Sequence, residues 1–191
     1  MTFLFSLLKI LIVIVPLLIA VAYFTLAERK VLGAMQRRRG PNVVGVYGLL
    51  QPLADGFKLL LKETIIPSVS NKFVFILAPI LTFFISLLGW GVIPYTKYSI
   101  LADLDLGLVY ILTVSSLSIY GILIAGWSSN SKYAFLGALR ATAQMISYEI
   151  SIGFILLTII LCAGSCNLTL IIEAQRQVWF VVPFFPLFLI F

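Results

Sequence analysis

The chain has 191 residues, of which 62% are apolar and 10% are charged, and its mean hydropathy is +1.15. So little polar surface cannot cover a water-soluble globule of this length, so the composition indicates an integral membrane protein. The net charge of +6 does not indicate nucleic-acid binding, because that function needs basic residues on a solvated fold. We therefore expect the lipid bilayer, and no nucleic acid, as a partner.

Long unbroken apolar runs predict an all-α fold, because the ten-residue alternation of a membrane barrel is not present. We expect a single membrane domain over residues 1–191 with about five transmembrane helices, the fifth of them truncated. The predicted spans lie near residues 3–25, 73–94, 106–125, 141–163 and 178–191. A further amphipathic helix is predicted in the connection between the first two spans.

That connection, residues 27–72, is strongly basic. It carries eight of the thirteen basic residues of the chain, namely Arg29, Lys30, Arg37, Arg38, Arg39, Lys58, Lys62 and Lys72. The positive-inside rule therefore places it on the cytoplasmic or matrix side. Glu28 is the acidic residue in the basic stretch 27–42, where its ionised form is favoured and where it can bridge to a neighbouring helix. The alternative is an ordinary cluster of interfacial charges.

The amphipathic helix is predicted near residues 49–63, within LLQPLADGFKLLLKET. Its polar side chains recur at intervals of four, three and four residues: Gln51, Asp55, Lys58 and Lys62. This spacing puts them in one stripe along a helix. The stripe is either the wet face of a helix lying in the membrane interface or the lining of a cavity, and the spacing leaves both open.

Glu149 lies within the fourth predicted span, nine residues after Arg140 and so about 13 Å along a helix. An ionised carboxyl at that depth is costly in hydrocarbon, so Glu149 must face protein, face water or be protonated part of the time. A proton-handling group fits each of these conditions. The alternative is a neutral or paired carboxyl that pins two helices together.

Several absences narrow the chemistry. The chain has no histidine, which excludes bis-histidine haem ligation and most zinc sites, and its two cysteines are too few for an iron–sulfur cluster. Neither a Walker A loop nor a dinucleotide-binding GxGxxG motif is present. We therefore expect no metal site and no redox centre, and in any redox reaction the electrons would arrive from another subunit.

Two long stretches read TLAERKVLGAMQRRRGPNVVGVYGLLQPLADGFKLLLKE and GWSSNSKYAFLGALRATAQMISYEIS. They strongly resemble the family of respiratory complex I membrane subunits that comprises NADH-ubiquinone oxidoreductase chain 1 and its bacterial counterparts. The resemblance covers nearly all of the chain, and AERK, RRGPN, LLQPLADG and GALRATAQMISYE are its most specific parts. It implies a subunit of a proton-pumping NADH:ubiquinone oxidoreductase that joins the membrane arm to the hydrophilic arm and builds much of the ubiquinone tunnel.

The same resemblance implies roles for individual residues, but it implies no residue that takes part directly in a chemical step of the reaction. The implied quinone-tunnel residues are Arg29, Arg37, Arg38, Gln51, Asp55 and Lys58. The implied members of a charged path for proton translocation are Glu28, Glu63, Arg140 and Glu149. Quinone reduction takes up two protons, and coupled acids with bases nearby can relay that change by shifting each other's pKa.

The resemblance also implies partners and a location. Ubiquinone would be a substrate, and FMN and iron–sulfur clusters would belong to partner subunits. These partners are the quinone-site subunits of the hydrophilic arm and the antiporter-like membrane subunits. The location would be the mitochondrial inner membrane with residues 27–72 on the matrix side, or alternatively a bacterial plasma membrane. Two other functions stay open: the membrane anchor of a related proton-pumping hydrogenase and a secondary transporter.

The fifth predicted span has 14 residues, about 21 Å as a helix, whereas a hydrocarbon core of roughly 30 Å needs about twenty. Pro183 and Pro186 weaken it further. The family continues beyond this point into an acidic loop and more helices. We expect a second polypeptide, from a split gene, to carry the rest of the subunit; an incomplete sequence is the alternative.

Overall fold

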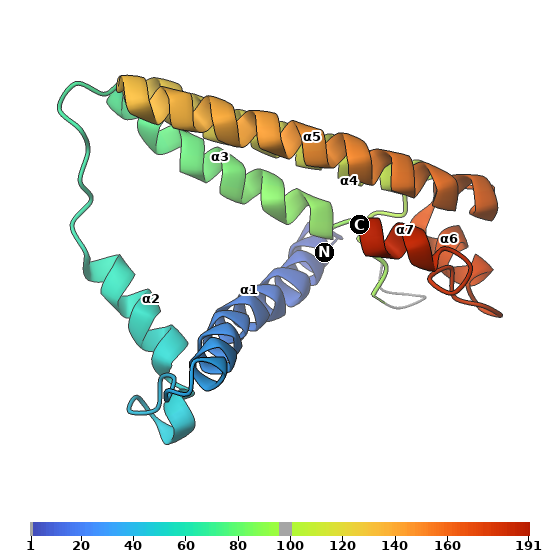
Figure 1. Cartoon of the computed structure of the whole chain (residues 1–191), viewed down its shortest axis with the longest axis horizontal. Helices are drawn as coiled ribbons and strands as arrows, with labels where there is room; N and C mark the ends of the chain where they lie inside the picture. The colour runs from blue at the N-terminus through green and yellow to red at the C-terminus, as the bar shows by residue number, and fades with distance from the viewer. Residues whose placement is uncertain (1, 96–100) are drawn as a thin grey trace. The chain divides into compact units, whose positions relative to one another are not determined.

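The computed structural model describes residues 2–95 and 101–191 (Figure 1). Throughout this part of the chain the regular secondary structure is helical, which confirms the predicted all-α fold. The chain divides into an N-terminal unit, Met1–Ile65, and a C-terminal unit, Ile66–Phe191. Each unit is described by itself.

The N-terminal unit begins with α1, Thr2–Met35, a helix of 34 residues. At 1.5 Å per residue it is about 51 Å long, so it exceeds the roughly 30 Å of a hydrocarbon core and extends well past the predicted span 3–25. The helix ends in a left-handed turn at Arg37, whose φ is 55°. The Arg38 N–H donates to the Gly33 carbonyl oxygen at 2.8 Å, which satisfies one of the last carbonyls of the helix.

The chain then folds back against the end of α1, and two glycines permit this return. A Cβ at Gly40 would lie 2.9 Å from the Lys30 Cα, and one at Gly48 would lie 2.3 Å from the Pro41 carbonyl oxygen. Gly48 also has a φ of 76°, which favours glycine. A short 3₁₀ turn, Val46–Gly48, leads to α2, Gln51–Leu61. Helix α2 contacts α1 and is slightly shorter than the predicted 49–63.

The C-terminal unit is built on three long helices: α3, Lys72–Trp90, α4, Gly107–Ser128, and α5, Lys132–Ala163. Helix α4 contacts both α3 and α5 (Figure 1). Glycines allow these contacts to be close, since a Cβ at Gly121 would lie 2.0 Å from Thr82 of α3, and one at Gly126 would lie 2.2 Å from Ala138 of α5. Small residues at helix contacts are typical of membrane helix packing, where backbones approach closely.

The last of these helices, α5, has 32 residues, about 48 Å, and ends at Gly164, whose φ is 68°. The polar start 132–140 and the predicted span 141–163 therefore form one continuous helix. Beyond it lie α6, Leu168–Ala174, and α7, Phe185–Ile190. Within residues 178–191 the only helix is the short α7, and the fifth span stays a prediction.

Among the residues that the structure describes, four helical segments are long and apolar enough to cross a membrane by length and composition: Leu7–Met35, Lys72–Trp90, Gly107–Ser128 and Lys132–Ala163. Most of their apolar side chains are exposed to the surroundings rather than buried against other helices of the chain. In water such a surface would be unstable, so lipid or other polypeptides must cover it. The structure therefore agrees with an integral membrane protein.

Candidate functional site

The first polar cluster lies in the N-terminal unit, where α1 and α2 meet. Arg29 Nη1 donates to Asp55 Oδ2 at 2.7 Å, and Gln51 Nε2 donates to Asp55 Oδ1 at 3.0 Å. Both carboxylate oxygens of Asp55 therefore have a donor. Gln51 precedes Asp55 by one helical turn on α2, whereas Arg29 comes from α1, so the cluster joins the two helices.

Charge and hydrogen bonding keep Asp55 ionised. The hydrogen bond from Arg29 lowers the pKa of Asp55 below its usual 3.8, and the bond from Gln51 lowers the pKa further. Lys58, one turn later on α2, adds a smaller effect in the same direction. The Arg29 and Asp55 side chains are 54% and 36% exposed, so we expect the ion pair to orient the carboxylate more than to stabilise the fold.

The basic turn after α1 lies beside this cluster. Arg38 Nε donates to Gln36 Oε1 at 2.8 Å, and Arg37 forms the left-handed turn with an exposed side chain. A cavity of about 600 Å³ is lined by Arg38, Arg39, Gly40, Pro41, Asn42, Val43 and Gln51. Gln51 therefore contacts Asp55 through its amide nitrogen and also borders a cavity with two guanidinium groups on its wall.

Lys30 holds the returning chain in place. Its Nζ donates to the Tyr47 carbonyl oxygen and lies 5.9 Å from the centre of the Tyr47 ring, within the range of a cation–π contact. Tyr47 has a φ of 54°, which is uncommon for a residue with a side chain. The bond from Lys30 thus helps to fix the entry into α2, on which Gln51 and Asp55 stand.

The second cluster lies in the C-terminal unit, between α4 and α5. Glu149 of α5 is partly buried, and its Oε1 accepts hydrogen bonds from Ser115 Oγ at 2.7 Å and Ser116 Oγ at 2.6 Å. Both serines belong to α4. The carboxyl group predicted to lie inside a membrane span therefore has two hydroxyl donors from the neighbouring helix.

The sequence did not lead us to these serines. They are adjacent hydroxyl residues in a predicted span that carries no charge, and this doublet is the signal that could have identified them. Arg140, which the resemblance places in the same charged path, is exposed and forms no ion pair with Glu149. The two positions are nine residues apart, about two and a half helical turns, which agrees with the separation expected from the sequence.

Two other residues predicted to belong to the charged path, Glu28 and Glu63, do not lie in either cluster. Glu28 is exposed on α1, and Glu63 is exposed just after α2. Within residues 2–95 and 101–191 neither side chain makes a hydrogen bond or an ion pair. Their assignment to a charged path stays a prediction.

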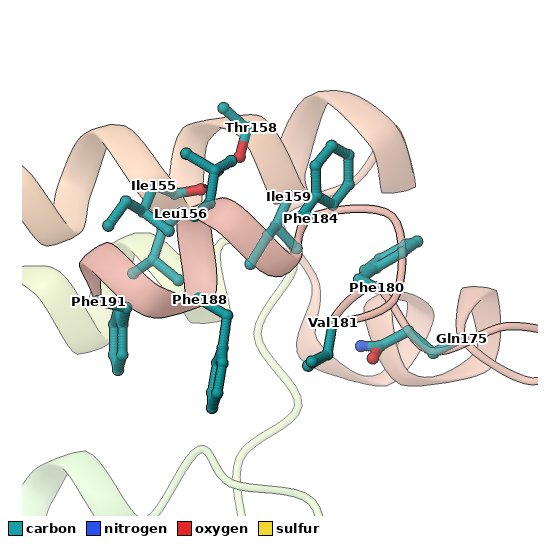
Figure 2. Close-up of a pocket in the computed structure, with 11 residues that line it drawn as sticks. Ile155, Leu156, Thr158, Ile159, Gln175, Phe180, Val181, Phe184, Phe188 and Phe191 are labelled. Carbon is teal, nitrogen blue, oxygen red and sulfur yellow. Dashed lines mark hydrogen bonds between the residues drawn. The ribbon is translucent and has the colours of Figure 1, made fainter.

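A third feature is an apolar cavity of about 230 Å³ in the C-terminal unit. Figure 2 shows its lining side chains, which include Ile155 and Ile159 from α5 and the rings of Phe180, Phe184 and Phe188 from the last segment of the chain. None of the residues predicted to be functional lines this cavity. It offers apolar surface but no charged group for chemistry.

The two polar clusters differ in what they can do. The Asp55 cluster offers a fixed negative charge next to guanidinium groups, which suits the binding of a polar head group. The Glu149 cluster offers a carboxyl that neutral hydroxyls support, which suits holding or passing a proton. In the part of the chain that the structure describes, no group of three or more His, Cys, Asp or Glu residues could hold a metal ion.

Comparison with known proteins places the chain in a family. The family model described as NADH dehydrogenase matches residues 8–191. NADH-ubiquinone oxidoreductase chain 1 of Chondrus crispus is 62% identical over 190 residues, which are 99% of this chain and 58% of that protein. An NADH-quinone oxidoreductase subunit of the bacterium Paramagnetospirillum magneticum is 59% identical over 96% of this chain and 54% of its own length.

A third relative, NADH-ubiquinone oxidoreductase chain 1 of Metridium senile, is 61% identical over 96% of this chain and 55% of its own length. The chain thus spans between 54% and 58% of the length of these three relatives. The match of the family model to almost the whole chain agrees with the resemblance in the two long motifs. The chain belongs to the NADH dehydrogenase family.

Proposed function

We propose that the chain forms part of the membrane subunit of a proton-translocating NADH:quinone oxidoreductase, respiratory complex I. The proposal is supported by relatives at about 60% identity whose names describe them as NADH-ubiquinone or NADH-quinone oxidoreductase components. The electrons would come from partner subunits that carry FMN and iron–sulfur clusters. This chain would supply part of the wall of the quinone-binding tunnel and charged residues of the proton path.

The Asp55 cluster would belong to a quinone-binding tunnel. The observation that carries this proposal is the convergence of Arg29 and Gln51 on one carboxylate beside a cavity with further guanidinium groups. A quinone has a polar head with two carbonyl oxygens and an apolar tail. Donors on one side of α2 and exposed apolar residues such as Leu53 and Phe57 on the same helix match these two parts.

The basic residues around the cluster would face both the head group and a partner. Arg37, Arg38 and Lys58 are exposed and positively charged. We assign Arg37 and Arg38 to the contact with the quinone-site subunits of the hydrophilic arm, and Lys58 to the tunnel side of α2. Positive charge there would also stabilise the negative charge that develops on a quinone during reduction.

Glu149 would belong to a charged path that couples quinone reduction to proton translocation, together with Glu28, Glu63 and Arg140. The two donors to Glu149 are neutral hydroxyls, and among the described residues Glu149 forms no ion pair that would hold it in the ionised form. The path would lead toward antiporter-like membrane subunits. The location would be the mitochondrial inner membrane, with residues 27–72 on the matrix side, or a bacterial plasma membrane.

The experiment that tests this proposal is Asp55→Asn in the assembled complex. The amide keeps the shape of the side chain but removes its charge, so electron transfer from NADH to quinone should fall severalfold. Electron transfer from NADH to an artificial acceptor that reacts upstream of the quinone should be unchanged.

Asp105→Asn provides the matched control, because Asp105 is exposed and lies outside α2 and its cluster. This variant should keep normal quinone reduction. Normal quinone reduction in Asp55→Asn would contradict the tunnel assignment. Equal loss with both acceptors would indicate a defect in assembly instead of the tunnel.

A further inference from the structure

Two hydroxyl groups from neighbouring positions of α4 converge on a single oxygen of Glu149. Ser115 Oγ and Ser116 Oγ lie 2.7 and 2.6 Å from Glu149 Oε1. Successive residues on a helix do not normally face the same way. Their convergence therefore depends on the position of Glu149 Oε1, which extends from α5 to a point between the two serine side chains of α4.

Each hydroxyl also has a second acceptor within reach. Ser115 Oγ lies 2.8 Å and Ser116 Oγ lies 2.9 Å from the Leu112 carbonyl oxygen. A serine hydroxyl has one proton, so it donates to one acceptor at a time. In an α-helix the Leu112 carbonyl also accepts the N–H of Ser116, so it keeps a partner when both hydroxyls turn away.

Each serine Oγ therefore lies within hydrogen-bond distance of two acceptors, Glu149 Oε1 and the Leu112 carbonyl oxygen. Rotation about the Cβ–Oγ bond can turn the O–H from one acceptor to the other without moving the Oγ atom.

We propose that Ser115 and Ser116 form a hydroxyl switch that positions Glu149, donating to its Oε1 when the carboxyl is ionised and to the Leu112 carbonyl when it is protonated. Neither serine gains or loses a proton; each O–H only rotates about its Cβ–Oγ bond. Glu149 can then exchange a proton while α4 and α5 stay in place. The inference rests on the proposed role of Glu149 in the charged path.

Other groups near Glu149 do not take this role. Helix α4 has no charged residue between Gly107 and Ser128. The other titratable or charged side chains on α4, on α5 and on α6, which also contacts α5, are Tyr110, Tyr120, Lys132, Tyr133, Arg140, Tyr148, Cys162 and Glu173. Among the described residues, none of them forms a hydrogen bond or an ion pair with Glu149.

The ordinary role of serine in a membrane helix is to donate to a carbonyl of the preceding turn. Ser118 of α4 does so, with its Oγ 2.6 Å from the Ser115 carbonyl oxygen, and it does not reach a carboxyl. Ser118→Ala is therefore the matched control, because it removes a hydroxyl from the same helix without removing a donor to Glu149.

The experiment is infrared spectroscopy of the purified assembled complex. The carboxylate bands of Glu149 are those that Glu149→Gln removes from the spectrum. Because Oε1 accepts two hydrogen bonds and, among the described residues, Oε2 accepts none, the two C–O bonds of the carboxylate are unequal. This inequality widens the frequency separation between the antisymmetric and symmetric carboxylate stretches. The double variant Ser115→Ala, Ser116→Ala should narrow this separation and lower proton pumping per electron pair severalfold.

The double variant Ser115→Thr, Ser116→Thr keeps both hydroxyls and should restore the separation and the pumping, whereas Ser118→Ala should change neither. If the double alanine variant does not assemble, each single alanine variant should give a smaller narrowing. An unchanged separation in the alanine variants would overturn the switch. Normal pumping in Glu149→Gln would instead overturn the proposed charged path, and the carboxylate bands would still decide whether the serines position Glu149.

Discussion

The two carboxyl clusters of this chain show two ways of supporting an acid in a membrane protein. Asp55 in the N-terminal unit pairs with the guanidinium group of Arg29, and Gln51 supplies the second donor. Glu149 in the C-terminal unit lies on a long apolar helix and receives its hydrogen bonds from two neutral serines. One acid has a permanent countercharge and the other has donors without charge.

This difference has a chemical consequence. A carboxylate beside a fixed cation stays ionised, which suits a permanent binding surface. A carboxylate supported by neutral hydroxyls has no such cation beside it, and hydroxyls that can rotate to another acceptor suit a group that changes its charge. The comparison therefore agrees with the proposed roles, binding for Asp55 and proton transfer for Glu149. The following experiments test that division and the helix packing that supports it.

The largest effect is expected for Glu149→Gln. The amide keeps the size and most hydrogen bonding of the side chain but cannot exchange a proton, so proton pumping should fall by about tenfold or more, as is typical when a positioned proton-transfer group is removed. Pumping in reconstituted vesicles is the measurement, with the amount of assembled complex measured in parallel. Normal assembly with normal pumping would favour a carboxyl that only pins α4 to α5.

The next largest effect concerns the partners of Asp55. Arg29→Gln should lower NADH:quinone electron transfer severalfold, because Asp55 loses the donor that orients it. If Arg29 acts through Asp55, the double variant with Asp55→Asn should lose less activity than the product of the two single losses. The measurement is the steady-state rate of NADH:quinone electron transfer in the unchanged complex, the two single variants and the double variant. If the loss in the double variant equals the product of the two single losses, Arg29 has a role separate from Asp55.

A smaller effect is expected where α4 and α5 pack together. In Gly126→Ala the new Cβ would lie 2.2 Å from the Ala138 Cβ, so the helices must shift, at a cost of about 1–3 kcal/mol. The thermal midpoint for loss of the assembled subunit should fall. Gly153→Ala on α5 is the matched control, because a Cβ there meets nothing within 4 Å. Equal destabilisation by both variants would contradict the close packing at Gly126.

The smallest effect concerns the pH dependence of Asp55. Because Arg29 and Gln51 lower its pKa below 3.8 in the folded chain, the contribution of the ion pair is present above pH 3.8 and is lost as the pH falls through the lower folded value. Infrared bands that Asp55→Asn removes should therefore still indicate a carboxylate at pH 3.8. In Arg29→Gln those bands should be lost at a higher pH than in the unchanged chain, and identical titrations would exclude Arg29 as the main cause.

Local patterns in the sequence predicted much of the N-terminal unit. The spacing of Gln51 and Asp55 predicted that they share a helical face, and in the structure they form a hydrogen bond. The remaining members of the stripe, Lys58 and Lys62, are exposed. The identity of the cation that meets Asp55 could not be read from spacing, because Arg29 lies 26 residues earlier on another helix.

The C-terminal unit shows the same limit more strongly. The apolar runs predicted helices near the positions of α3, α4 and α5, and a lone acid in a span predicted that Glu149 must face protein, face water or be protonated part of the time. The donors themselves lie 33 and 34 residues away on α4. The spacing of residues along α5 alone does not indicate which turn of α4 will contact Glu149.

The sequence by itself therefore determined the all-α membrane fold, the approximate positions of the long helices and the acids that require partners. These properties follow from composition and from periodicities of a few residues, which act along one helix. Only the tertiary structure decided the partners, Arg29 for Asp55 and the serine pair for Glu149. Helix pairing depends on close contacts such as Gly126 with Ala138, and the register of two packed helices is set by the shapes of both surfaces together.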